Sequence, residues 1–233
     1  MNLIYISMAV APALAIALYI YWKDKHEKEP VGVLVMCFFL GVLICFPAGF
    51  WNSGVFEIFK FDLDEENNDM FVSFFMAFFV VGLGEELLKY LVVVLYAFRK
   101  PSFNEPFDGI VYAVMVSLGF AAFENIIYVI EGGMGVAIMR MFTAVPMHAA
   151  FAVIMGYYIG LSKYYQGSAR TEKSLKGLFY AVVLHGAYDF VLFQDDIPLL
   201  KLMIFPMIIW AFFLCRKAMT KHLNVSPFHP DRK

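Results

Sequence analysis

The feature that most constrains this chain is a series of long apolar runs that contain no charged side chain. The first run covers residues 3–22 and the second covers 31–56, so they comprise 20 and 26 residues. A helix rises about 1.5 Å per residue, so about 20 residues cross the hydrocarbon core of a bilayer. Charged residues make up 16% of the chain, against about 25% in a soluble domain. These runs predict an all-α, polytopic membrane helix bundle.

We expect one transmembrane domain over residues 1–233, in which four helices at about 70–193 form a catalytic core and three others flank it. Basic residues fall in the odd-numbered connections and the C-terminal tail, whereas the even-numbered connections hold only Lys60. This alternation predicts that the N-terminus lies outside and the C-terminus in the cytoplasm. The seven predicted membrane spans are 3–22, 31–52, 70–98, 107–131, 138–162, 174–193 and 198–216.

Composition narrows the possible partners. The formal net charge is −2 and no basic patch favours nucleic acid, so membrane lipids and membrane proteins are the expected partners. The three cysteines form neither a metal-binding spacing nor an evident disulfide framework. An acidic stretch at 62–69 lacks the ligand pattern of a calcium loop, so a solvated outer loop is predicted there. The oligomeric state stays open.

Three ionisable residues, Glu85, Glu86 and Lys89, interrupt the third span, although 70–84 and 90–98 carry no charge. Each costs roughly 2.5–3.5 kcal/mol at the centre of a membrane helix. One glutamate could pair with Lys89, three or four residues away, as a structural contact. That pairing would leave the other glutamate over, so the group predicts a functional site that faces the bundle interior.

Four further ionisable or imidazole side chains lie inside the next three predicted spans. Counted from the cytoplasmic end of each span, all fall at a similar depth, roughly 16–26 Å above the cytoplasmic face. Their convergence in depth predicts a single site in the middle to outer half of the membrane. Taken singly, such residues have simpler explanations. Asn125, next to Glu124, could be a helix–helix hydrogen bonder, and a lone histidine is more often a packing residue. The four residues are Glu124, His148, His185 and Asp189.

Two histidines and four carboxylates at one depth favour hydrolysis. A carboxylate can activate water as a general base, and a cation or an imidazole can stabilise the oxyanion. Intramembrane carboxylates and histidines also build proton relays, so an ion- or proton-coupled transporter or channel is the alternative. The chain lacks the repeated halves that are common in such transporters.

At this point the motifs resemble those of a known family, the PrsW family of bacterial intramembrane proteases, which is grouped with CAAX-type and bacteriocin-processing relatives. The resemblance extends from about 82 to 189. In the CAAX-type relatives the second motif ends in histidine, and Glu124 stands there in this chain. The motifs, in order on successive helices with His148 before the last, are Glu85-Glu86-x-x-Lys89, Phe120-x-x-x-Glu124 and His185-x-x-x-Asp189.

The resemblance implies an enzyme of the bacterial cytoplasmic membrane that makes the first cut in a membrane-anchored anti-sigma factor, on the extracytoplasmic side, during a stress response. It implies that Glu85 and Glu86 are the catalytic glutamates, and we prefer Glu85 as the base. His185 would be essential and Lys89 would orient a glutamate. The site would be completed by Glu124, His148 and Asp189, with Phe120 and Asn125 in support.

Metal use separates two forms of this hypothesis. The family is classed with metalloproteases, whereas the CAAX-type relatives resemble metal-free glutamate enzymes. So many carboxylates in a cavity of low dielectric could not all ionise without a cation. We therefore expect one divalent metal ion, zinc, with ligands drawn from His148, His185, Asp189 and Glu124.

Overall fold

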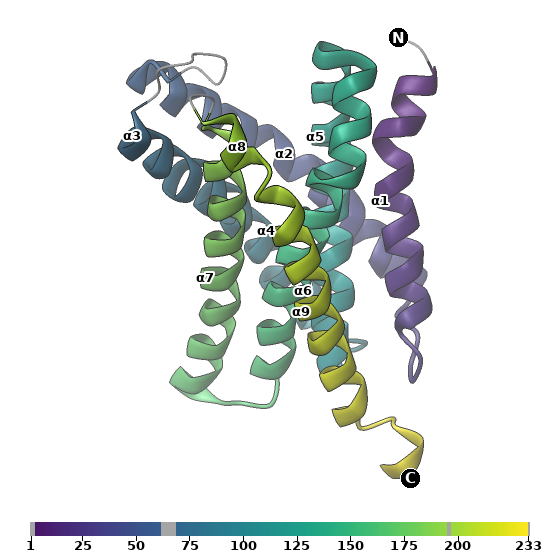
Figure 1. The fold of residues 1–233 in the computed structure, drawn as a ribbon. Helices are drawn as coiled ribbons and strands as arrows, with labels where there is room; N and C mark the ends of the chain where they lie inside the picture. Colours follow the sequence, from purple (N-terminus) through teal and green to yellow (C-terminus); the bar gives the residue numbers. More distant parts are fainter. Residues whose placement is uncertain (1–2, 62–68, 195–196, 233) are drawn as a thin grey trace.

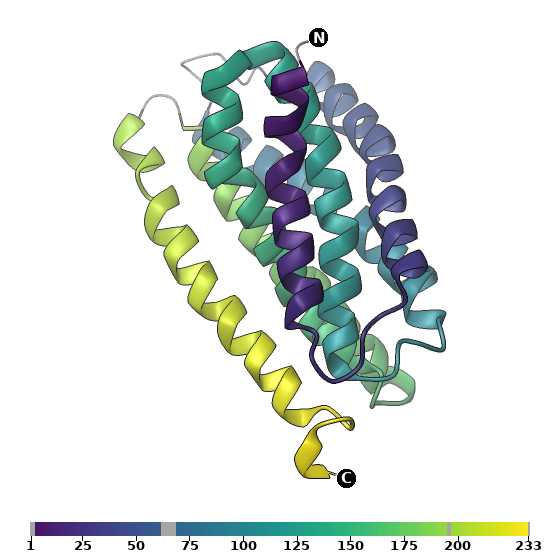
Figure 2. The same ribbon diagram turned by 90° about the vertical axis from the view of Figure 1, so that its right-hand side faces the viewer.

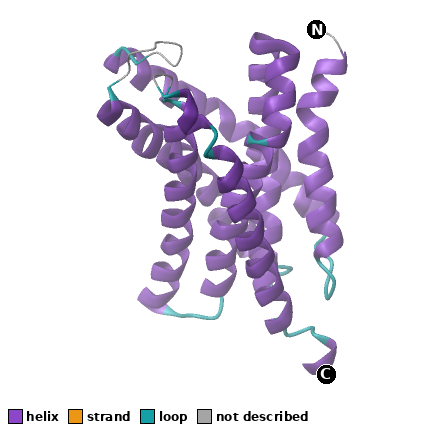
Figure 3. Cartoon of the chain, in the orientation of Figure 1, coloured by secondary structure: helices purple, strands orange, loops and turns teal. Residues whose placement is uncertain are grey.

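The structure, a computed structural model, describes residues 3–61, 69–194 and 197–232, and within them every regular element is a helix (Figures 1 and 3). The predicted outer loop at 62–69 lies outside the described residues except for Asp69, which caps the helix that follows it. The elements are α1 Leu3–Lys23, α2 Val31–Phe59, α3 Met70–Phe75, the π-helix η1 Met76–Gly82, α4 Leu83–Leu95, η2 Ala97–Arg99, α5 Pro106–Phe142, α6 Ala144–Ser162, α7 Gly167–Leu192, α8 Pro198–Lys201, α9 Ile204–Val225 and η3 Pro230–Arg232.

Among the described residues, six helical segments are long and apolar enough to cross a membrane, which confirms a polytopic helical membrane protein. The count differs from the predicted seven because 106–162 forms one segment of 57 residues. This segment contains α5 and α6, which the sequence divides into spans at 107–131 and 138–162. No loop separates these two spans. The chain stays helical between them except at Gly133 and at the junction of α5 with α6.

The 106–162 segment folds back on itself, as Figure 2 shows, and its helix is interrupted at Gly133. Gly133 has φ +70°, a conformation that glycine adopts more readily than other residues. Contacts on either side pair residues equidistant from this point: the Ser117 hydroxyl donates to the His148 carbonyl at 2.9 Å, and Gly109 packs against the Gly156 backbone. The segment therefore forms two antiparallel arms.

Several helices extend past the predicted spans. α2 continues to Phe59, α7 begins at Gly167 instead of 174, and α9 continues to Val225. The added turns of α7 and α9 carry polar and basic residues. Backbone hydrogen bonding continues a helix wherever the residues permit it, whereas hydropathy marks only the part suited to lipid.

A π-helical stretch, η1, directly precedes the Glu85–Glu86 pair in the continuous helix from 70 to 99. π-Turns are rare and occur often at functional sites. The Trp51 indole nitrogen donates to the Val80 carbonyl at 3.2 Å, so α2 supplies a partner for the backbone of this stretch.

α5 is the centre of the bundle and packs against α1, α2 and α6. Its contact with α2 is backbone to backbone: a Cβ at Gly119 would lie 1.9 Å from the Phe38 carbonyl oxygen, and one at Gly41 would lie 2.0 Å from the Val116 carbonyl oxygen. Small residues allow such close approach of membrane helices. This contact fixes where α2 stands relative to the helices that follow.

We predict that Gly119→Ala destabilises the protein by about 1–3 kcal/mol, because the added methyl forces α2 and α5 apart. Thermal unfolding in detergent would measure the loss. Gly32→Ala is the matched control on α2, since a Cβ there meets nothing within 4 Å. Equal stability of the two variants would contradict the close contact.

At the opposite end of the bundle from Gly133, Glu29 is buried in the connection between α1 and α2, where the Tyr112 hydroxyl donates a hydrogen bond to it. Burial, reinforced by the nearby Asp108 carboxyl, raises the pKa of Glu29 to about 9. A carboxyl with a raised folded-state pKa holds its proton in the folded protein and loses it in the unfolded chain. Its contribution to stability is thus present at low pH.

We therefore predict that the free energy of unfolding falls as pH rises from about 5 to about 9, and that Glu29→Gln flattens this dependence. Unfolding temperatures of the two proteins across that pH range would measure the effect. A parallel decline in both would show that Glu29 does not cause it.

Candidate active site

The three ionisable residues of α4 form a compact, buried cluster. Lys89 donates to Glu86 Oε1 at 2.7 Å and to Glu85 Oε2 at 3.4 Å. The residue exposures are 3% for Glu85, 0% for Glu86 and 1% for Lys89. A single lysine thus contacts both glutamates, and the shorter contact is with Glu86. The lysine nitrogen also lies 4.2 Å from the centre of the Phe120 ring, a cation–π contact.

His185, on α7, lies among three carboxylates. Its Nδ1 lies 2.9 Å from Glu86 Oε1, and its Nε2 lies 3.2 Å from Asp189 Oδ2 and 4.0 Å from Glu85 Oε2. Glycines bring the two helices together here, because a Cβ at Gly82 would lie 3.2 Å from the backbone nitrogen of Gly186. A carboxylate on one ring nitrogen fixes the orientation of the imidazole and presents the other nitrogen to the site.

The two arms of the α5–α6 hairpin add Glu124 and His148. His148 Nε2 lies 3.0 Å from Glu124 Oε2, and His148 Nδ1 lies 3.3 Å from the Lys89 nitrogen. The Phe151 ring, one turn along α6 from His148, stacks on His185 with ring centres 4.8 Å apart. The four helices that sequence reasoning selected therefore do bring their polar residues together, and the predicted convergence is confirmed.

Arg140 is a site residue that the sequence analysis missed. It lies on the returning part of α5 and donates to Glu124 Oε2 at 2.8 Å and to Asn125 Oδ1 at 2.6 Å. Asn125 in turn donates to the Ala9 carbonyl of α1 at 3.0 Å, so it is a helix–helix hydrogen bonder as well as a support for the site. Arg140 is the one basic residue between 101 and 162. That isolation in an apolar stretch was the available signal.

Asn52 of α2 is the second missed residue. Its side-chain nitrogen donates to Glu85 Oε1 at 3.3 Å. No charge or motif marks it in the sequence, and only the crossing of α2 over α5 places it beside α4.

These residues surround a cavity of about 610 Å³. Glu85, Glu124, His148, His185 and Asp189 line the cavity, whereas Glu86 and Lys89 do not. The two neighbouring glutamates thus differ: Glu85 faces the open space and Glu86 lies behind it.

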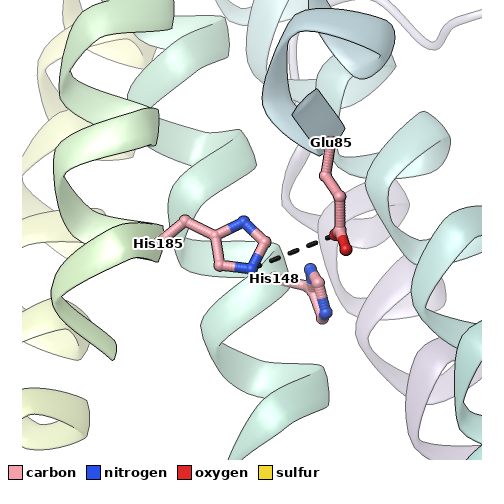
Figure 4. Close-up of side chains that lie close together, drawn as sticks. All are labelled: Glu85, His148 and His185. Atoms are coloured by element: carbon pink, nitrogen blue, oxygen red, sulfur yellow. Dashed lines mark ion pairs between the residues drawn. The ribbon is translucent and has the colours of Figure 1, made fainter. Parts of the chain in front are cut away.

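Glu85, His148 and His185 form a group that could hold a metal ion, since one ligand atom of each lies within 4.8 Å of the others (Figure 4). Tetrahedral zinc with ligands at about 2.1 Å separates neighbouring ligand atoms by about 3.5 Å, so small side-chain movements would suffice. Two histidines and one glutamate are an established donor set for a catalytic zinc that keeps a position for water. The chemistry of the residues present therefore fits the ion.

This group differs from the ligand set expected from the sequence. Both histidines are in it, but the carboxylate is Glu85 in place of Asp189 and Glu124. Asp189 instead lies beside Nε2 of His185, and Glu124 lies beside Nε2 of His148. The ligand set and the catalytic roles of individual residues stay predictions.

The comparisons with known proteins agree with this site. A profile described as PrsW family intramembrane metalloprotease matches residues 29–215. Protease PrsW of Bacillus subtilis is 35% identical over 220 residues, covering 94% of this chain and 97% of the relative. Protease PrsW of Oceanobacillus iheyensis is 36% identical over 211 residues (91% and 93%), and that of Clostridioides difficile is 30% identical over 227 residues (94% and 91%).

No solved structure matches the chain. The profile covers most of the sequence and includes every ionisable side chain of the cavity wall named above. The chain belongs to the PrsW family of intramembrane metalloproteases.

Proposed function

We propose that this intramembrane metalloprotease cleaves a peptide bond in a single-span membrane protein, such as an anti-sigma factor, on the extracytoplasmic side of a bacterial cytoplasmic membrane. The observation that carries the proposal is the buried group of Glu85, His148 and His185, which lies on a cavity inside a bundle of membrane-spanning helices. Because the cavity lies among membrane-spanning helices, it suits a substrate that is itself in the membrane.

The side of cleavage depends on a topology with seven crossings and the N-terminus outside. The fold-back at Gly133 supports the seventh crossing, because it divides the 57-residue segment into two arms. The basic residues of the odd-numbered connections and of the tail support the orientation. In that orientation, the Gly133 end of the hairpin lies outside and Pro106 and Ser162 lie near the cytoplasm.

The charge of the site supports a divalent ion, for which we propose zinc. The carboxylates of Glu85, Glu86, Glu124 and Asp189 face the cations Lys89 and Arg140, so four negative charges meet two positive ones and a formal −2 remains while the histidines are neutral. A buried charge is costly unless it is compensated. With Glu85 kept as the base, His148, His185 and the Glu124 or Asp189 carboxylate would hold the ion. Zinc bound there would supply Lewis-acid polarisation and lower the pKa of water.

Glu85 is the better candidate for the general base, because it lines the cavity and Glu86 does not. Glu86 accepts from Lys89 at 2.7 Å and lies 2.9 Å from His185. The corresponding contacts of Glu85 are longer, at 3.3 Å to Asn52 and 3.4 Å to Lys89. Glu85 is therefore the glutamate that a water molecule in the cavity can reach, whereas Glu86 Oε1 holds the His185 ring and Lys89.

Arg140 is proposed as a positioning residue. By holding Glu124 and Asn125 together, it directs the Glu124 carboxylate toward His148. The Arg140 guanidinium also compensates the negative charge of Glu124, which stands where the CAAX-type relatives have a histidine.

We predict about one zinc ion per chain in the purified protein, with cleavage lost on chelation and restored by zinc. Elemental analysis and cleavage of a single-span substrate in proteoliposomes would test this. Full activity of a protein that contains no metal would instead establish a metal-free glutamate protease.

We further predict that Glu85→Gln lowers the cleavage rate by about 10²–10⁴-fold, the range for loss of a general base, while zinc stays bound. Glu86→Gln is the matched comparison: it should weaken zinc binding as well, because His185 loses the partner that orients it. Zinc content and rate are measured on the same samples. Loss of zinc in Glu85→Gln would reassign Glu85 from base to ligand.

A further inference from the structure

The active-site cavity continues away from the metal-binding group, between the outer parts of α2 and α5. α2 presents one face to it, at positions spaced 4, 3, 1 and 3 residues apart, the repeat of a single helix face. These positions are Cys45, Gly49, Asn52, Ser53 and Phe56.

α5 faces the same cavity with an identical spacing. The two helices meet below these positions, at the backbone contacts of Gly41 with Val116 and of Gly119 with Phe38. Above that crossing, α2 and α5 each present one face to the cavity. The α5 positions are Phe120, Glu124, Ile127, Tyr128 and Glu131.

The two helices touch at the lower end of these faces and separate above it. At the lower end, Phe46 packs on Phe123 with ring centres 4.8 Å apart, and Cys45 packs in a cluster with Phe120. Within the described part of the chain, no hydrogen bond, ion pair or ring contact joins α2 from 49 onward to α5 from 124 onward. Figure 1 shows α2 leaning from α5 toward α3. The α2–α5 mouth is the gap between the cavity-lining residues above this contact: Gly49, Asn52, Ser53 and Phe56 of α2, and Glu124, Ile127, Tyr128 and Glu131 of α5.

Three of the four α2 residues of the mouth, Gly49, Asn52 and Ser53, are small or polar, and large apolar residues there would close it. Gly49 lines the cavity, and a Cβ there would meet nothing within 4 Å. On the opposite side, Ile127 and Tyr128 are 42% and 38% exposed. The mouth is thus an opening at the level of the bilayer that leads to Glu85 and the histidines.

The lining favours a peptide over a lipid chain as the occupant. Asn52 Oδ1 is a buried acceptor with no hydrogen-bond partner, and Ser53, Tyr128 and Glu131 add polar groups. A protease must unwind a helical segment to reach its peptide bonds, and the freed backbone groups then need partners within the membrane. An acyl chain would need none.

We infer that substrate enters the active site sideways from the bilayer, through the α2–α5 mouth, as the unwound outer end of the transmembrane segment of a single-span protein. This inference rests on the proposed proteolytic function. It makes the mouth, and Asn52 in particular, the place where the substrate backbone is received before it reaches Glu85.

The test compares Gly49→Trp with Gly54→Trp in proteoliposomes that contain a single-span reporter. The indole at 49 would fill the mouth, and kcat/KM is expected to fall by at least about tenfold without loss of zinc. Gly54→Trp is the matched control, since 54 also has no neighbour within 4 Å but does not line the cavity, and it should cleave like the wild type. Wild-type cleavage by zinc-loaded Gly49→Trp would overturn lateral entry here.

A second measurement decides the matter if Gly49→Trp fails to fold. A photo-crosslinking residue at Ser53, in a Glu85→Gln background, is expected to capture the reporter, whereas the same residue at Gly54 should not. Equal capture at both positions, or none at 53, would overturn the inference. Failure of the wild type to cleave any single-span substrate is a distinct result, because it would overturn the proposed function and lateral entry with it.

Discussion

The need to compensate buried charge dominates this structure. Carboxylates within membrane-spanning helices are costly unless each finds a partner, and here the partners come from other helices. Glu86 of α4 contacts His185 of α7, and Glu124 of α5 contacts His148 of α6. Lys89 links the two pairs, because it reaches both Glu86 and His148. The polar contacts that build the active site thereby also set the relative positions of α4, α5, α6 and α7.

Close approach of backbones makes these contacts possible. Glycines at the crossing of α2 and α5, and in the two arms of the α5–α6 hairpin, remove the side chains that would hold the helices apart. Gly82 and Gly186 do the same one turn or less from Glu86 and His185. The π-helix η1, which precedes Glu85, adds a wider turn, and the Trp51 indole of α2 donates a hydrogen bond to the Val80 carbonyl of η1. α2 is therefore part of the site's support, although it carries no charge over its first 26 residues.

The sequence predicted the features that depend on hydropathy and helical spacing. The membrane class, the polar residues of four helices and their common depth could be read from local patterns, and the structure brings those residues together. The fold-back at Gly133 could not be placed, because apolar residues continue on both sides and only the backbone of one glycine reverses the chain. Arg140 and Asn52 were missed for a related reason: their partners are distant in sequence and depend on which helices cross.

The position of each glutamate relative to the cavity distinguishes Glu85 from Glu86. Glu86 and Glu124 have contacts of 3.0 Å or less with charged or imidazole nitrogens. Glu124 lines the cavity, whereas Glu86 lies behind Glu85. Glu85 has only longer contacts, and its neighbour Asn52 keeps an acceptor without a partner. An acceptor without a partner is unfavourable in hydrocarbon, and Asn52 Oδ1 is such an acceptor in the wall of the cavity that Glu85 also lines. The proposed base and the proposed place of entry therefore share one cavity, as lateral entry of a substrate to that base would require.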